Sequence, residues 1–159
     1  MTEINTTEDH NASENMQKYY NYKEQFRRLN KAMRAGFYLE AMFIEYAILE
    51  DRTTAVLRYE NNSIKPRGDR LPSIDAKLKK IKTIAREKKG LPKRYFKDEL
   101  IDQILVWKEE RNRMIHALLK QQLTTEKLIQ LAEEGKALAE ELRNKSGNYK
   151  KAVERKNRV

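Results

Sequence analysis

The chain of 159 residues contains no cysteine, only five glycines and only three prolines. The absence of cysteine excludes disulfide bonds, thiolate catalysis and cysteine-ligated zinc or iron–sulfur sites. It also agrees with a reducing cytoplasm. A β-sandwich or a doubly wound α/β sheet needs many turn residues, so the scarcity of glycine and proline argues against both folds.

Long apolar runs are missing as well. No stretch approaches the roughly 18 apolar residues that would cross a bilayer, and the sequence MTEINTTEDH is too acidic and polar for a secretory signal. We therefore expect no membrane partner. Charge is abundant: 34 Lys and Arg against 24 Asp and Glu give a net charge of +10. Polyanions such as RNA are the first partners to consider.

The positive charge is concentrated in two parts of the chain. Residues 64–94 hold twelve Lys and Arg against three Asp and Glu, and residues 143–159 hold seven against one. The first segment supplies the candidate nucleic-acid-binding residues, which are Arg67, Arg70, Lys79, Lys80 and Lys82. A merely solvated basic helix face is the alternative explanation.

Hydrophobic periodicity predicts an all-α fold, an antiparallel bundle of about five helices. The expected helices cover about 14–34, 36–60, 73–90, 94–121 and the chain from 124 onward. The sequence NNSIKPRGDRLP at 61–72 is the long irregular stretch. We expect a disordered acidic arm at 1–14, a helical-bundle domain at 15–146 and a basic tail at 147–159.

The expected helix 36–60 is apolar on two faces. Around Tyr46 one face carries Leu39, Met42, Phe43, Leu49, Thr53 and Leu57, and the opposite face carries Phe37, Ala41, Ile44, Ile48 and Ala55. Such a helix is either the central helix of the bundle or one that also carries a dimer contact. Glu50 lies about 40° from Tyr46 on the inner stripe, so its carboxylate should be paired.

On the expected helix 94–121, Arg111 lies in the middle of an apolar stripe. Leu100, Ile104, Trp107, Met114, Ile115 and Leu118 all fall within about 60° of it. Arginine is almost never fully buried unless it is paired. Arg111 is therefore either a snorkelling or Glu50-paired core residue, or a cation held in a pocket to meet a phosphate. His116 follows at about 140° around the helix.

The segment Arg111-Asn112-Arg113-Met114-Ile115-His116 resembles the signature of HEPN-domain ribonucleases, an Arg, an adjacent polar residue and a His after four to six residues. The resemblance extends to a small all-α bundle with the motif on a late helix. It implies that Arg111, Asn112 and His116 are catalytic. It also implies supporting roles for Glu50 and Asp51 on the early helix and for Arg113.

This resemblance implies metal-independent RNA cleavage by attack of the 2′-OH, which leaves 2′,3′-cyclic phosphate ends. His116 would move a proton and Arg111 would hold phosphate oxygens. No cofactor is expected, because His10 and His116 are the only histidines and no carboxylate cluster surrounds His116. One motif supplies one histidine whereas the reaction needs a proton acceptor and a donor, so a homodimer is implied.

The resemblance further implies a toxin or antiphage setting, with an antitoxin or regulator as a partner. Leu118 stands where toxins held by nucleotidyltransferase-type antitoxins carry a Tyr, which argues against that mode of control. The alternative is a non-catalytic bundle, such as a phage or mobile-element accessory protein, that binds nucleic acid or protein. In it Arg111 and Glu50 would form a buried structural pair.

Overall fold

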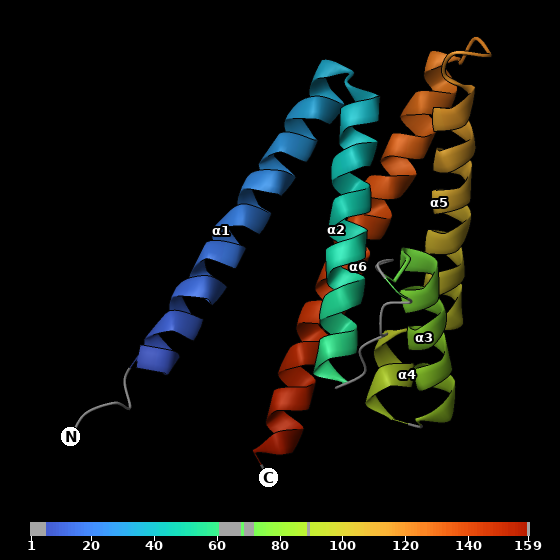
Figure 1. Cartoon of the computed structure of the whole chain (residues 1–159). Helices are drawn as coiled ribbons and strands as arrows, with labels where there is room; N and C mark the ends of the chain where they lie inside the picture. Colours follow the sequence, from blue (N-terminus) through green and yellow to red (C-terminus); the bar gives the residue numbers. More distant parts are fainter. Residues whose placement is uncertain (1–5, 61–67, 69–71, 89, 159) are drawn as a thin grey trace.

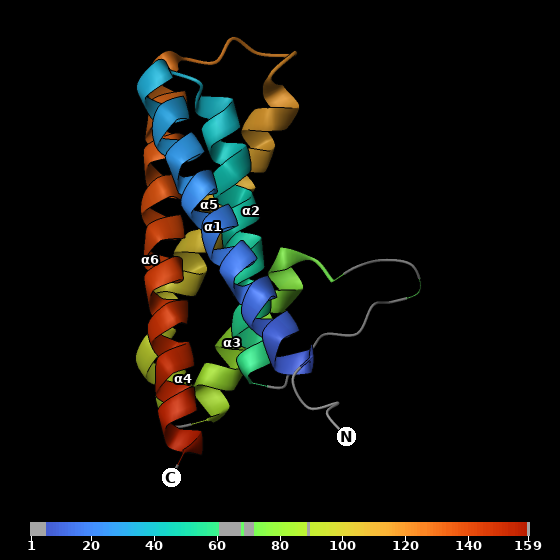
Figure 2. The same ribbon diagram turned by 90° about the vertical axis from the view of Figure 1, so that its left-hand side faces the viewer.

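The computed structural model of the chain describes residues 6–60, 68, 72–88 and 90–158, with side chains from residue 12 onward. These residues form six α-helices and no strand: α1 (Thr6–Ala35), α2 (Tyr38–Tyr59), α3 (Ile74–Glu87), α4 (Leu91–Tyr95), α5 (Asp98–Ala117) and α6 (Thr125–Asn157). The helices pack into an elongated bundle (Figures 1 and 2). The predicted all-α class is confirmed.

Helices α2 and α6 form the centre of the bundle. Helix α2 packs more extensively against α6 than against any other helix, and α1 and α3 pack on its other sides. Both central helices run in one direction, whereas α1 and α5 run the opposite way (Figures 1 and 2). The predicted antiparallel arrangement therefore holds for α1 with α2 and for α5 with α6, but it is wrong for the central pair.

Both apolar faces of α2 contribute to the core. Met42, Leu49 and Leu57 are buried on one face, and Ala41, Ile44 and Ile48 are buried on the other. Of the two interpretations that the sequence left open, the structure shows α2 as the central helix.

Small residues on α6 help the helices to approach one another. Ala132 and Ala139 are fully buried, and Gly135 between them has no room for a Cβ atom. Trp107 of α5 spans this interface, and its indole Nε1 donates a hydrogen bond of 2.8 Å to the carbonyl oxygen of Leu131.

The two ends of the chain differ from the sequence-based expectation. Helix α1 begins at Thr6, so residues 6–14 are helical rather than part of a disordered arm. Extending an existing helix adds one hydrogen bond for each residue fixed, which costs much less than nucleating one. The tail expected at 147–159 is instead the last part of α6, which continues to Asn157.

Buried aromatic packing explains why α6 continues so far. The side chain of Tyr149 is fully buried, with its ring 5.1 Å from that of Phe96 and 5.9 Å from that of Tyr95. Apolar burial of this size outweighs the tendency of a charged helix end to fray. The helical bundle therefore extends through residue 157.

Candidate functional site

The structure places Arg111 on α5, at the contact between α5 and α2. Its guanidinium lies over the ring of Tyr46, with Cζ 4.7 Å from the ring centroid. Its Nη1 donates a hydrogen bond of 3.1 Å to the side-chain oxygen of Asn112. Trp107 and Met114 on the same stripe are buried, which explains why the Arg111 side chain is itself half-buried. A cation over a tyrosine face is favourable, but the contact does not neutralise the charge.

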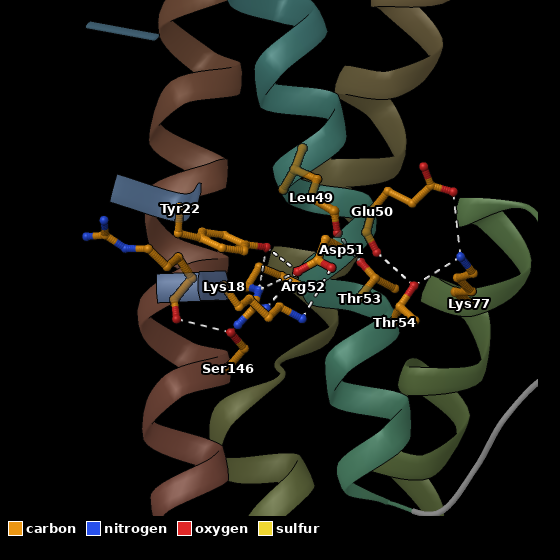
Figure 3. Close-up of polar contacts among 11 residues, drawn as sticks. Lys18, Tyr22, Leu49, Glu50, Asp51, Arg52, Thr53, Thr54, Lys77 and Ser146 are labelled. Carbon is orange, nitrogen blue, oxygen red and sulfur yellow. Dashed lines mark hydrogen bonds and ion pairs between the residues drawn. The ribbon is translucent and has the colours of Figure 1, made fainter. Parts of the chain in front are cut away.

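Glu50 does not pair with Arg111, so that part of the expectation is wrong. The Glu50 carboxylate lies 3.5 Å from Lys77 Nζ on α3, and Lys77 also donates a hydrogen bond to Thr54. Figure 3 shows this group on the α3 side of α2. The Glu50 side chain is 43% exposed and does not lie on a buried inner stripe, and its carboxylate pairs with Lys77 of α3.

Asp51 also lies away from Arg111. It accepts hydrogen bonds from Tyr22 and Arg52 and lies 3.5 Å from Lys18, all on the α1 side of α2 (Figure 3). Burial opposes ionisation of Asp51, but these hydrogen bonds and the two cations outweigh it, so its pKa is lowered. Neither Glu50 nor Asp51 supports the motif in the way that the resemblance implied.

A third carboxyl group, Glu45, was missed by the sequence analysis. Its side chain is fully buried over Gly135, beside Trp107, and both its oxygens are buried with no hydrogen bond to the described residues. Burial raises its pKa to about 9, although the charges of Lys136 and Arg111 oppose the shift. Glu45 is therefore protonated at neutral pH, and it leaves the charge of Arg111 unneutralised.

One sequence signal could have pointed to Glu45. Gly135 interrupts the apolar stripe of α6 between Leu131 and Leu138, and an isolated glycine inside a helix often marks a close approach. Which side chain packs against Gly135 depends on the relative position of α6 and α2, and the sequence pattern does not predict this position.

Arg111 is thus a cation without a carboxylate partner among the described residues. Its Nε atom is buried and forms no hydrogen bond with them. Burial lowers the pKa of Arg111, partly offset by Tyr46 and Glu45, yet a guanidinium stays protonated in proteins. An incoming anion at the guanidinium could neutralise this charge.

One turn earlier on α5, Lys108 is neutralised. Its Nζ lies 2.5 Å from Asp75 and 2.7 Å from Glu109. Burial acts to lower the pKa of Lys108, but the hydrogen bonds to the two carboxylates outweigh it and raise the pKa. The two cations therefore differ in their free charge, although they lie one turn apart on one helix.

His116 is exposed in the last turn of α5. It forms no hydrogen bond or ion pair with the described part of the chain, and Arg113 is likewise exposed. Asn112 and His116 are four residues apart, so their Cβ atoms are neighbours at about 5–6 Å on the helix surface. The structure joins Arg111 to Asn112 and places His116 one turn further along the helix surface. It does not itself bring Arg111 and His116 into contact.

Apolar side chains are exposed at this end of the bundle. Phe43 of α2 is 70% exposed, and Leu39, Ile115 and Leu118 are each about 40% exposed (43%, 38% and 37%). The first turns of α2 and the last turns of α5 reach the same end (Figures 1 and 2). We call these four residues the end patch. It continues the stripes of Tyr46 and Arg111 on their respective helices.

The predicted nucleic-acid-binding residues are only partly available. Lys82 is paired with Asp102 at 2.7 Å, so it is not a free cation. Lys79 and Lys80 are exposed and form no ion pair with the residues that the structure describes. Arg67 and Arg70 lie outside the described residues.

Comparisons with protein-family models, curated proteins and solved structures found no match for this chain. In the described ranges no helix is long and apolar enough to span a membrane, and no three His, Asp or Glu side chains are grouped as a metal site. The fold and site define an all-α bundle with an unneutralised, half-buried arginine where α2 meets α5. The HEPN resemblance rests on the residues Arg111, Asn112 and His116.

Proposed function

We propose that the protein is a cytoplasmic, metal-independent endoribonuclease of the HEPN type that acts as a homodimer in a toxin or antiphage setting. The observation that carries the proposal is that the charge of Arg111 is not neutralised. Its charge has no carboxylate partner among the described residues, its Nε is an unused donor, and the motif histidine is exposed one turn further along α5. The rival binding bundle required an Arg111–Glu50 pair, and Glu50 pairs with Lys77 instead.

The reaction needs three kinds of group. The ribose 2′-oxygen attacks phosphorus and gives its proton to a base, while the bond to the 5′-oxygen breaks and that oxygen takes a proton from an acid. A nearby cation stabilises the charge that develops on the phosphoryl oxygens. His116 suits proton transfer near neutral pH, and Arg111 suits the phosphoryl oxygens because it can donate two parallel hydrogen bonds.

A second subunit would supply the second histidine. The end patch is the surface that we assign to this contact, because it is apolar and begins directly beside Arg111 and His116. Pairing two copies there would place two motifs at one interface and cover Phe43. Phe43→Asp is then expected to give a monomer in analytical ultracentrifugation and to abolish cleavage, with Val106→Asp as a control at an exposed apolar residue outside the patch.

The proposal is tested by incubating the purified protein with RNA in excess chelator, beside His116→Ala. We expect the wild type alone to cleave, with 2′,3′-cyclic phosphate and 5′-OH ends. His10→Ala, which changes the one other histidine, should cleave like the wild type. If no RNA is cut while wild type and His116→Ala bind RNA equally, the protein is a binding bundle instead.

A further inference from the structure

A groove of about 720 Å³ lies between α1, α2 and α6, on a different side of α2 from Arg111. Cations and aromatic rings line it. The cations are Lys18, Lys23, Arg52, Arg58, Arg143 and Lys150, and the aromatic residues are Tyr19, Tyr22, Phe26 and Tyr59. No acidic side chain is among the described residues that line it.

The positive charge of the groove is only partly neutralised. Lys18 and Arg52 share the single carboxylate of Asp51 (Figure 3). Lys150 lies at 3.9 Å from Glu154, a solvent-exposed pair of little energetic weight. The other cations of the groove have no carboxylate partner within the described ranges of the chain.

Three cations, one from each helix, remain free. Lys23 of α1 and Arg58 of α2 are exposed and form no ion pair with described residues, and the same is true of Arg143 of α6. Arg143 instead lies over the ring of Phe26, with Cζ 4.4 Å from the centroid. The free charges therefore follow the groove across all three helices that form it.

The aromatic rings are placed between these cations. Tyr19 is 61% exposed at one edge, and Tyr59 lies near Lys150, whose Nζ is 6.0 Å from the ring centroid. Tyr22 is held in place, because its hydroxyl donates to Asp51 and accepts a hydrogen bond of 2.7 Å from Arg52. An exposed ring beside a free cation offers a stacking face and a phosphate contact within about one nucleotide of each other.

We propose that this groove binds single-stranded nucleic acid, with phosphates on Lys23, Arg58 and Arg143 and a base stacked on Tyr19. Bases must be unpaired to stack on side chains, so a duplex could use only the charges. The apolar floor, Phe26 and Ala55, is buried, so the groove exposes no aliphatic side chain for insertion into a lipid bilayer. The site is independent of the cleavage proposed at Arg111.

The opposite flank of α6 sharpens the assignment. A second groove, of about 580 Å³ between α5 and α6, is lined by Glu99, Asp102, Glu134 and Glu141. This acidic surface would repel a polynucleotide. A nucleic-acid strand that binds the protein is therefore directed to the α1–α2–α6 groove.

The test measures binding of labelled twelve-nucleotide oligouridine and oligodeoxythymidine by fluorescence anisotropy. All proteins carry His116→Ala, so that nothing is cut. The groove variant is Lys23→Glu with Arg58→Glu, and the matched control is Lys31→Glu with Arg34→Glu, which changes one lysine and one arginine of α1 outside the groove. Both double variants lower the net charge by the same amount and change exposed side chains without ion pairs among the described residues.

The groove variant should weaken binding by about tenfold and reduce the slope of log affinity against log salt by about 1.4, the value for two lost phosphate contacts. The control should change affinity by less than about twofold. Equal effects of the two variants would overturn the proposal, as would binding to phosphatidylserine vesicles in place of the oligonucleotides. Binding to one oligonucleotide only would assign the groove to RNA or to DNA.

Tyr19→Ala tests the stacking step. It should weaken single-strand binding by about fivefold or more and leave duplex binding unchanged, whereas Phe37→Ala, which changes an exposed aromatic residue outside the groove, should leave both unchanged. Equal loss for single strands and duplex would show a purely electrostatic surface. Since binding is measured without cleavage, absence of nuclease activity would leave this result intact.

Discussion

Two basic surfaces of this protein differ in how far the fold neutralises them. On α3 and at its C-cap, Lys82, Arg86 and Lys88 are paired with Asp102, Asp98 and Glu60 at 2.7, 2.9 and 2.7 Å. In the α1–α2–α6 groove, Lys23, Arg58 and Arg143 have no such partner among the described residues. Pairing with carboxylates therefore removes part of the positive charge around α3, where Lys79 and Lys80 stay unpaired among the described residues. The density of positive charge in the sequence does not by itself identify the better site for a polyanion.

The same difference occurs within α5. Lys108 lies between Asp75 and Glu109, whereas Arg111 has a tyrosine ring and a neutral amide. Each nearby acid is unavailable to Arg111, since Glu50 is paired with Lys77 and Glu45 is protonated. We take Lys108 as structural and Arg111 as functional, and the following predictions test that distinction.

The largest expected effect is on cleavage. Arg111→Ala should lower the rate of RNA cleavage by about 10²–10⁴-fold, because the cation near the reacting phosphate is lost. Arg111→Lys keeps the charge but loses the two-pronged donor geometry, so it should recover only part of the rate. Single-turnover kinetics on RNA measure both. Full activity of Arg111→Ala would remove Arg111 from the site.

The next largest effect concerns the buried acid beside Arg111. In Gly135→Ala the new Cβ would lie 2.2 Å from Glu45 Oε2 and 2.5 Å from Trp107 Cζ2. The free energy of unfolding should fall by about 2–4 kcal/mol, despite the better helix propensity of alanine. In Gly147→Ala of the same helix no atom lies within 4 Å, so stability should rise by about 0.5–1 kcal/mol. Urea denaturation compares the two, and equal effects would contradict the close packing.

A stability measurement separates Lys108 from Arg111. Lys108→Met leaves Asp75 without its buried cation, so it should cost about 1–3 kcal/mol of unfolding free energy. Arg111→Met leaves no carboxylate unpaired, so stability should stay within about 0.5 kcal/mol or increase. Comparable losses in urea denaturation would show that Arg111 is a structural residue.

The last prediction is a pH dependence of stability. Glu45 has a folded pKa of about 9 against an ordinary value of 4.5, so the folded chain binds one more proton than the unfolded chain between those values. Its contribution is fully present below about pH 4.5 and is lost as the pH rises towards 9, by up to about 1.4 kcal/mol per pH unit. Glu45→Gln should flatten the fall of stability between pH 6 and about pH 9. An unchanged profile would mean that Glu45 is already ionised in the fold.

The helices and the position of Arg111 could be predicted from sequence, because periodicity reports which face of a helix is buried. Ion-pair partners could not, because they depend on which helix packs beside that face. Glu50 illustrates this, since a paired carboxylate was predicted, but its partner Lys77 comes from α3 and its side chain is 43% exposed. The continuation of α6 to Asn157 was missed because most residues near its end are charged, which is typical of a solvated tail. Tyr149 is the residue in that segment whose buried ring packs against the bundle.

The most direct test of the account is whether Arg111 receives a phosphate. The Nε–H resonance of Arg111 can be followed by NMR while uridine 2′,3′-cyclic phosphate is added, with Arg111→Lys to assign the signal. The account predicts that this resonance shifts, because an anion binds the guanidinium to which the Nε–H belongs. An unmoved Arg111 signal, with shifts confined to other arginines, would contradict it.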